Sequence, residues 1–216
     1  HIFEANLADA SERAGLVARA KEMAVNVLVN LAGVNDLSLI EDTSDEKNSQ
    51  IINMNLSTPI NLTREMLGGF KQQEGGVIIN VGSIMGSIGY PGSAIYCASK
   101  FGFRGFSEAL RRELAGSSIK VIYLAPRATA TAMNNDSMIG MNKALGVNVD
   151  APEVVATKLV KALSRAHSQT FYLGWPEKLF VKINALFPWL VDSAVLKQLP
   201  IIQHYAKLKI AVEKVI

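Results

Sequence analysis

The sequence predicts an α/β fold built on a doubly wound parallel sheet. Three short apolar runs read as buried strands, at residues 25–30, 77–81 and 120–125. Longer segments with helical spacing of apolar residues separate them. Alternation of strands and helices is typical of a parallel sheet with helices on both faces.

Capping residues and prolines mark the ends of the predicted helices. Ser11 is a suitable N-cap for the first, and either Thr43 or Ser44 for the second. Pro59 is expected to bend or divide the second helix, and Pro152 stands in the first turn of the last. The predicted helices cover residues 11–23, 44–73, 96–115 and 152–166, and short strands are also predicted at residues 1–4 and 170–173.

The composition suits one folded domain with a large core, because 49% of the 216 residues are apolar. The single cysteine, Cys97, excludes an internal disulfide framework, and the three histidines lack the spacing of metal ligands. We therefore expect no metal. Residues 171–216 hold six lysines against three acidic residues and so carry the whole net charge of +3. No basic and aromatic stripe indicates a nucleic-acid partner.

The longest uncharged stretch, residues 75–99, could be mistaken for a membrane span. It holds six glycines, four serines and Pro91, which suits a strand followed by a loop better than a membrane helix. The start of the sequence shows no signal-peptide pattern. We expect a cytoplasmic protein.

Ser83, Tyr96 and Lys100 are the candidate catalytic residues. Tyr96 and Lys100 are four residues apart in a predicted helix, so they share one face. A lysine ammonium there favours the phenolate and is expected to lower the pKa of Tyr96 from its usual value of about 10. Such a tyrosine can exchange a proton with a carbonyl or alcohol oxygen, to which Ser83 offers its hydroxyl.

The Tyr96–Lys100 spacing alone is a weak signal, because it is common on surface helices. Its context makes it more specific. Ser83 follows the apolar run 77–81, and a glycine-rich loop leads from it to the helix that carries Tyr96. Open parallel sheets bind ligands at the carboxyl ends of their strands, and the three residues are expected to meet there.

Five pieces of sequence occur in the order and spacing of the short-chain dehydrogenase/reductase family, which the chain resembles up to about residue 175. The pieces are Asn30-Leu31-Ala32-Gly33, Asn55-Leu56, Ser83, Tyr96-x-x-x-Lys100, and Pro126 with Thr131. The resemblance implies a Rossmann-like, NAD(P)(H)-dependent oxidoreductase. Its reaction would move a hydride between nicotinamide and a carbonyl or alcohol carbon of an apolar small molecule.

The resemblance also implies a role for each catalytic residue. Tyr96 would be the general acid or base, and Ser83 would bind the substrate oxygen. Lys100 would lower the pKa of Tyr96 and contact the nicotinamide ribose. Asn55 would hold a water molecule of the proton relay.

A cofactor site for NADP(H) or NAD(H) follows from the same resemblance. We favour NADP(H), because the reductive members of the family commonly use it. Thr131 would contact the nicotinamide carboxamide. The implied cofactor-binding residues are Asn6, Leu7, Asn30, Ala32, Gly33, Tyr96, Lys100, Pro126, Thr129 and Thr131.

The sequence departs from the family pattern in one large and three small ways. The glycine loop G-x-x-x-G-x-G, which cradles the pyrophosphate at a helix N-terminus, does not occur, and the sequence is expected to begin at the family's third strand. Asn6 replaces an aspartate and Leu31 an asparagine. Arg127 replaces a glycine, which would bring a positive charge to the edge of the cofactor.

Residues 174–216 extend beyond the predicted Rossmann-type domain, residues 1–173. Trp175, Phe180, Phe187 and Trp189 stand among lysines in this tail. A single helical face is predicted from its apolar residues at 179, 180, 183, 186, 187 and 190. Three interpretations stay open for the tail: packing on a partner subunit, a lid over the active site, or peripheral contact with a membrane.

Two expectations concern partners and substrate. In the family the helix that carries Asn55 and the helix 96–115 commonly form the subunit interface, which implies a homodimer or homotetramer. The substrate is expected to meet the loops 84–95 and 131–151. The second loop holds three methionines, which suit either a pliable apolar pocket or ordinary core packing.

The alternative function is a non-catalytic relative that binds dinucleotide and acts through its tail on a partner or a membrane. The complete set of Asn55, Ser83, Tyr96 and Lys100 favours an enzyme, because a binding protein does not need a tuned tyrosine.

Overall fold

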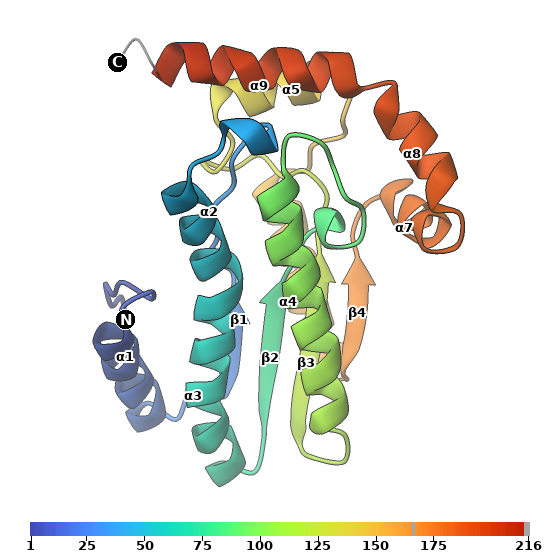
Figure 1. Ribbon diagram of the computed structural model, residues 1–216. Helices are drawn as coiled ribbons and strands as arrows, with labels where there is room; N and C mark the ends of the chain where they lie inside the picture. The colour runs from blue at the N-terminus through green and yellow to red at the C-terminus, as the bar shows by residue number, and fades with distance from the viewer. Residues whose placement is uncertain (166, 214–216) are drawn as a thin grey trace.

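The structure, a computed structural model, describes residues 1–165 and 167–213, with the side chains of the last helix described up to residue 208. Four strands form one parallel sheet in the order β1-β2-β3-β4 (Figure 1). Asn30 pairs with Asn80, which pairs with Tyr123, so the first three strands end at one edge of the sheet. The strands are β1 (Val27–Asn30), β2 (Gly76–Val81), β3 (Ile119–Ala125) and β4 (Gln169–Tyr172).

Helices cover both faces of the sheet, as the alternation in the sequence predicts. Ile78 and Val121 face α3 (Thr58–Gln72) and α4 (Ala94–Glu113), with α1 (Ala10–Glu22) packed beside α3. Ile79 and Ile122, one position further along each strand, face α6 (Pro152–Arg165). Because successive strand side chains point to opposite faces, both faces of β2 and β3 are apolar and buried. The predicted α/β fold class is confirmed.

Strand β1 lies at the edge of the sheet and is covered less completely. Val29 is 38% exposed, whereas Ile78 and Ile79 of the neighbouring strand are fully buried. The strand predicted at residues 1–4 does not form, and that prediction was wrong. These residues make no ladder with the sheet and are exposed beside α1.

The long helical segment after β1 is divided, but not at Pro59. The 3-10 turn η1 (Ile40–Asp42) precedes α2 (Asp45–Ile52), which Ser44 caps by accepting a hydrogen bond from the Lys47 N–H. A π-helical turn, η2 (Asn53–Ser57), then joins α2 to α3, and Pro59 stands in the first turn of α3. The N-cap of α1 is Asp9 rather than the predicted Ser11, because the Asp9 carboxylate accepts from two N–H groups of the first turn.

The described part of the C-terminal tail, up to residue 213, forms three helices: α7 (Glu177–Leu186), α8 (Pro188–Leu196) and α9 (Leu199–Glu213). The single amphipathic face predicted across residues 179–190 is wrong. Phe187 leaves the helical conformation and Pro188 begins a new helix, so residues on either side of this break do not share a face.

Helix α9 packs on the rest of the molecule through α5 (Asp136–Ala144), above the carboxyl end of the sheet (Figure 1). Ile202 and Ala206 are fully buried against Leu37, Met138 and Met141. Within the described part of the chain, no helix combines the length and apolar character needed to cross a membrane.

We expect Gly82→Ala to destabilise the protein by about 1–3 kcal/mol or more, because a Cβ here would overpack the core. That atom would lie 2.1 Å from the Tyr123 hydroxyl oxygen, and the Tyr123 ring is fully buried and cannot move aside. The matched control is Gly105→Ala in α4, where nothing lies within 4 Å of the added Cβ. This control is expected to gain up to about 1 kcal/mol. Urea unfolding of both variants measures the effect, and equal stabilities would contradict the packing argument.

Candidate active site

Four segments meet where β1, β2 and β3 end. These segments carry Gly33, Asn55, Lys100 and Met133. Gly33 follows β1, and a Cβ added to it would contact atoms of the other three residues. That Cβ would lie 3.1 Å from Asn55 Oδ1, 3.7 Å from Lys100 Nζ and 3.8 Å from Met133 Cε. The structure therefore brings together Gly33, Asn55 and Lys100, three residues that the family resemblance assigns to the site. A side chain at residue 33 would fill the space between them.

Ser83 and Tyr96 bring two hydroxyl groups to the same place. Ser83 directly follows β2 and Gly82, and its Oγ accepts a hydrogen bond of 3.1 Å from the Met85 N–H at the start of the turn η3 (Ile84–Gly86). Tyr96 stands in the first turn of α4 and is buried, and its side chain hydrogen-bonds with Ser83. The pair can present two hydroxyl donors to one substrate oxygen.

Lys100 lies one helical turn after Tyr96 and is only 4% exposed. Its ammonium lies 5.6 Å from the centroid of the Tyr96 ring and donates a hydrogen bond of 3.3 Å to the Val81 carbonyl. An ammonium carries three N–H donors, so this contact leaves it able to bind a further acceptor.

The pKa of Tyr96 shifts in the direction opposite to the one expected. Burial raises the pKa of Tyr96 to about 12, and the hydrogen bond from Ser83 only partly opposes this. The predicted lowering of the Tyr96 pKa by Lys100 is therefore wrong, because desolvation of the phenolate dominates. Burial also lowers the pKa of Lys100 to about 8. At neutral pH the structure holds a protonated phenol beside a lysine that is still mostly cationic.

Asn55 lies in the π-helical turn η2, an irregularity often found at functional sites. Its Oδ1 accepts from the Val34 N–H and its Nδ2 donates to the Val34 carbonyl, both at 2.8 Å. Nδ2 also donates to Ser99 Oγ at 3.1 Å, and Ser99 donates to the Tyr96 carbonyl. Asn55 thus fixes the loop that carries Gly33 and connects it to the helix of Tyr96.

Sequence reasoning missed Ser99, Val34 and Val81 as supporting residues of this site. Val34 and Val81 act through backbone atoms, which leave no signal in a sequence. Ser99 precedes Lys100 in a helix interior, where serine is not favoured, and this position was the available signal.

Asn30 points its side chain into the protein interior. Its amide donates to Thr63 Oγ1 at 3.0 Å and to Asn80 Oδ1 at 2.9 Å, and Asn80 donates in turn to Ser107 Oγ at 2.8 Å. A contact between Asn30 and a cofactor would therefore use its backbone. The two residues that follow, Leu31 and Ala32, are exposed at the end of β1.

The predicted cofactor residues after β3 lie in one loop beside this edge. The Pro126 carbonyl accepts from the Ile84 N–H at 3.0 Å and so connects the loop to the Ser83 turn. The Thr129 hydroxyl donates to the Arg127 carbonyl at 3.0 Å, and Thr131 is exposed.

Arg127 does not present its charge to a cofactor as the sequence suggested. Its guanidinium donates to Asp150 Oδ1 at 2.7 Å and to Glu177 Oε2 at 3.3 Å. Two carboxylates neutralise it, and the charge instead connects the loop after β3 to the start of α7. Gly174, with a φ of +96°, leaves room for this contact, since a Cβ there would lie 2.7 Å from both Arg127 Cδ and Glu177 Oε2.

Asn6 and Leu7 lie in the segment before α1. The Asn6 N–H donates to Glu12 Oε2 and its Oδ1 accepts from the Ala8 N–H, while the Leu7 carbonyl accepts from Arg13 Nη1. These contacts hold the segment against α1. The described contacts do not join either residue to Tyr96 or Lys100.

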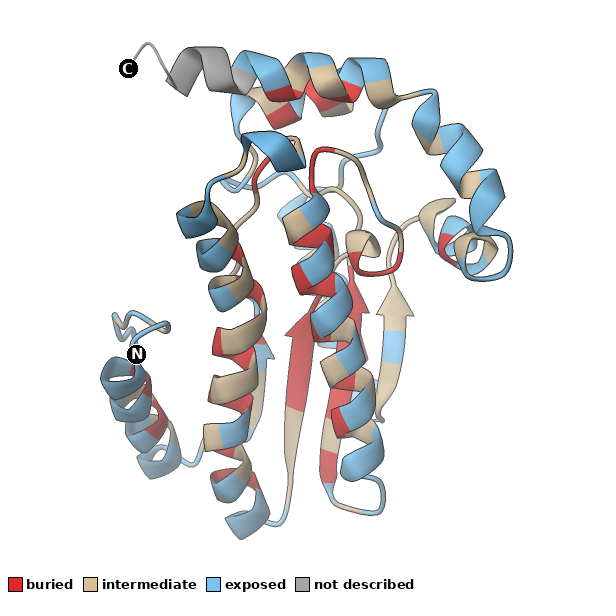
Figure 2. Cartoon of the chain, viewed as in Figure 1, coloured by how far each residue is buried: buried red, intermediate tan, exposed pale blue. Residues whose placement is uncertain are grey.

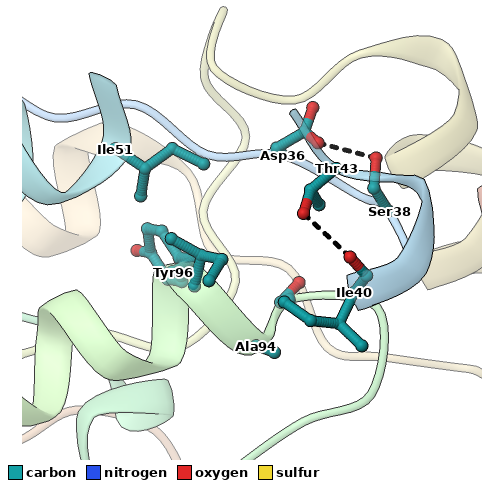
Figure 3. Close-up of a pocket in the computed structure, with 9 residues that line it drawn as sticks. Asp36, Ser38, Ile40, Thr43, Ile51, Ala94 and Tyr96 are labelled. Carbon is teal, nitrogen blue, oxygen red and sulfur yellow. Dashed lines mark hydrogen bonds between the residues drawn. The ribbon is translucent and has the colours of Figure 1, made fainter. Parts of the chain in front are cut away.

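A small pocket borders the Tyr96 ring and has room for about one water molecule (Figure 3). Figure 3 shows Asp36 and Ser38 on its far side, where Ser38 Oγ donates to Asp36 Oδ2 at 2.6 Å. The pocket is too small for an organic substrate. Among the described residues, no cluster of three or more His, Cys, Asp and Glu side chains is placed to hold a metal ion.

The residues present fit the nicotinamide and ribose end of a dinucleotide. The evidence is the space at Gly33, which is bounded by the amide oxygen of Asn55 and the buried ammonium of Lys100. Both are polar groups that a sugar hydroxyl can bind. The glycine pattern that cradles a pyrophosphate does not occur in this sequence, so the fit is limited to that end.

Comparison with known proteins relates this arrangement to one family. The family model described as short chain dehydrogenase matches residues 1–142. Nodulation protein G of Rhizobium meliloti (strain 1021) is 38% identical over 136 residues, which are 62% of this chain and 56% of that protein. The 3-oxoacyl-[acyl-carrier-protein] reductase FabG of Haemophilus influenzae is 39% identical over 109 residues, 50% of this chain and 45% of FabG.

A crystal structure from Beutenbergia cavernae superimposes with a TM-score of 0.70 and 26% identity, covering 78% of this chain and 72% of the other. That protein is a candidate NAD(P)-dependent gluconate 5-dehydrogenase and was crystallised with NADP at low occupancy. The present chain spans about half the length of the curated relatives it matches.

We expect Lys100→Met to change how stability depends on pH. The pKa of Lys100 falls from 10.5 to about 8 on folding, so between these values the unfolded chain binds more protons and stability rises with pH. Below about pH 8 the wild type bears the full cost of a buried cation. The advantage of Lys100→Met over wild type should therefore shrink by up to about 3 kcal/mol as the pH rises from 8 to 10.5. Urea unfolding across this range measures it, and a constant difference would contradict the shifted pKa.

Proposed function

Because the chain belongs to the short chain dehydrogenase family, we propose that it carries the catalytic residues of an NAD(P)(H)-dependent oxidoreductase. The reaction is hydride transfer between nicotinamide and a carbonyl or alcohol carbon of an apolar small molecule. The observation that carries this proposal is the pairing of the Ser83 and Tyr96 hydroxyls beside the buried Lys100 ammonium, at the carboxyl end of the sheet.

The protonation state of Tyr96 suits it to the role of proton donor. Tyr96, with a pKa of about 12, holds its proton at neutral pH and can donate it to a carbonyl oxygen. Ser83 donates a second hydrogen bond to that oxygen, which stabilises the negative charge that develops there. Lys100 remains cationic below about pH 8 and stabilises the phenolate left after proton transfer. The nicotinamide cofactor, when bound, supplies the hydride to the carbonyl carbon.

NADP(H) is the favoured cofactor, with NAD(H) as the alternative. The NADP in the Beutenbergia cavernae structure supports a nicotinamide dinucleotide as the cofactor. Gly33 and Lys100 would hold its ribose, Asn55 would extend the proton path toward Lys100, and Thr131 would contact the carboxamide. The remaining residues proposed to line the cofactor site are Asn6, Leu7, Asn30, Ala32, Pro126 and Thr129.

The substrate is proposed to be an apolar carbonyl compound. Leu37, Met138 and Met141 form an apolar cluster with α9 above the sheet edge, and methionines adapt to varied apolar shapes. The Haemophilus relative is a 3-oxoacyl-[acyl-carrier-protein] reductase, which supports a 3-oxoacyl thioester as the first compound to try. Because the pocket beside Tyr96 is small, substrate entry requires movement of the covering segments.

The remaining proposals concern assembly and location. A homodimer or homotetramer through α4 and the α2–α3 segment is supported by the family's habit and by the exposed Phe101 on α4. We also propose that residues 1–173 form the Rossmann-type domain and residues 174–216 an extension of it. The protein is proposed to be cytoplasmic, with peripheral membrane contact through this extension.

The deciding experiment measures fluorescence of NADPH and NADH on titration with the protein, followed by turnover of an acetoacetyl thioester. Binding of one nucleotide with oxidation of NADPH supports the enzyme. Nucleotide binding without turnover of any carbonyl compound would favour the non-catalytic alternative, in which the tail binds a partner or a membrane.

We expect Tyr96→Phe to abolish turnover and leave nucleotide affinity within about twofold, because only the proton donor is lost. Steady-state oxidation of NADPH and the nucleotide titration measure the two effects. Substantial activity in Tyr96→Phe would contradict the assigned role.

Lys100→Ala should weaken both turnover and nucleotide affinity, the latter by about tenfold or more, because the proposed ribose contact is charge-assisted. Circular dichroism checks that the variant is folded. If its nucleotide affinity equals that of the wild type, Lys100 does not contact the cofactor.

A further inference from the structure

Helices α7 and α8 expose an unusual amount of apolar side chain. Helix α8 contains six apolar residues besides its proline among nine, and within the described structure none of the nine is buried (Figure 2). Trp189 is 59% exposed, Leu186 is 68% exposed, and Trp175 just before α7 is 64% exposed. We call this the tail surface, defined by Trp175, Phe180, Leu186, Phe187, Trp189 and Leu190.

The tail surface is more than scattered exposed residues, which are normal on proteins. Helices α7 and α8 pack against each other, and the Phe187 and Trp189 rings stack edge to face with centroids 5.5 Å apart. The two helices together present Phe180, Phe187 and Trp189, in addition to Trp175 just before α7. Contiguous apolar patches of this kind mark interaction sites.

The charges around the tail surface are mainly positive. Lys178, Lys182 and Lys197 are exposed on α7 and at the end of α8, and the Lys178 ammonium lies 5.3 Å from the centroid of the Trp175 ring. Asp192 is the exposed acid of these two helices, because Glu177 is half-buried and paired with Arg127. The surface therefore combines apolar and aromatic groups with an excess of cations.

We propose that the tail surface docks the protein on an anionic lipid bilayer. Tryptophan prefers the boundary between headgroups and acyl chains, and lysine stems extend from that boundary to anionic headgroups. A second copy of this chain fits less well. In a twofold dimer the same patch would face itself, so each lysine cluster would oppose another with too few acids to pair.

The position of the tail surface connects docking to the site. Asn184 Nδ2 of α7 donates to the Ser87 carbonyl at 2.9 Å, four residues after Ser83. Docking would bring the Ser83 loop close to the bilayer, from which an apolar substrate could enter. This consequence rests on the proposed function, whereas the docking itself can be tested without any turnover.

Both tryptophans of the chain belong to the tail surface, so intrinsic fluorescence reports on it directly. The full chain is mixed with phosphatidylcholine vesicles and with vesicles that also contain phosphatidylglycerol. We expect a blue shift and quenching by brominated acyl chains with the anionic vesicles, weakened when salt rises from about 0.1 to about 0.5 M. No response to the anionic vesicles overturns the proposal. So does a blue shift that grows with protein concentration when vesicles are absent, since the chain would then bind itself.

Matched variants separate the apolar and charged parts. Phe187→Ser with Trp189→Ser should lower the bound fraction in vesicle co-sedimentation by about tenfold or more. Val160→Ser, at an exposed apolar position on α6, should leave it unchanged.

Lys182→Glu with Lys197→Glu should weaken binding to anionic vesicles about thirtyfold or more, because each lysine near an anionic membrane surface contributes about 1 kcal/mol to binding. Lys158→Glu with Lys161→Glu, exposed on α6, is the control for net charge and should have a smaller effect. Equal losses in both pairs, or undiminished binding in the Phe187 and Trp189 variant, would overturn docking through this surface.

Discussion

A short chain of buried amide hydrogen bonds holds the site in place. Asn30 of β1 donates to Thr63 of α3 and to Asn80 of β2, and Asn80 donates to Ser107 of α4. Polar groups buried in this way cost about 1–3 kcal/mol each if a partner is lost, so strands and helices can adopt only the arrangement that satisfies all of them. That arrangement fixes β1 against β2 and α4 against both. The loops carrying Gly33 and Ser83 and the helix carrying Tyr96 follow from it.

Burial then determines the chemistry of the two central side chains. Removing Tyr96 and Lys100 from water disfavours the charged form of each, which raises one pKa to about 12 and lowers the other to about 8. The spacing of four residues suggested that lysine acts on tyrosine as a nearby charge. In the folded chain desolvation is the larger effect, and Lys100 donates to the Val81 carbonyl. A ligand that binds between Gly33 and Lys100 would change this balance, because it would replace the surroundings of both groups.

The tail divides into a part that belongs to the core and a part that faces outward. Ile202 and Ala206 of α9 complete an apolar cluster with α5 and Leu37, so α9 is integral to the covering of the sheet edge. Helix α7 contacts the Ser83 loop through Asn184 and the Arg127 loop through Glu177, yet most apolar residues of α7 and α8 remain exposed. Helix α9 is therefore part of the core, whereas α7 and α8 face outward.

The sequence by itself determined the α/β class, the order of the central elements and the meeting of Ser83, Tyr96 and Lys100. Apolar runs, helix spacing and motif spacing are local properties that a linear chain records. Tertiary structure alone decided the inward direction of Asn30, the π-helical turn at Asn55, the pairing of Arg127 with Asp150 and Glu177, and the raised pKa of Tyr96. Each of these features depends on contacts between residues far apart in the chain, on backbone atoms or on the exclusion of water. Such contacts and such burial arise only when the chain folds.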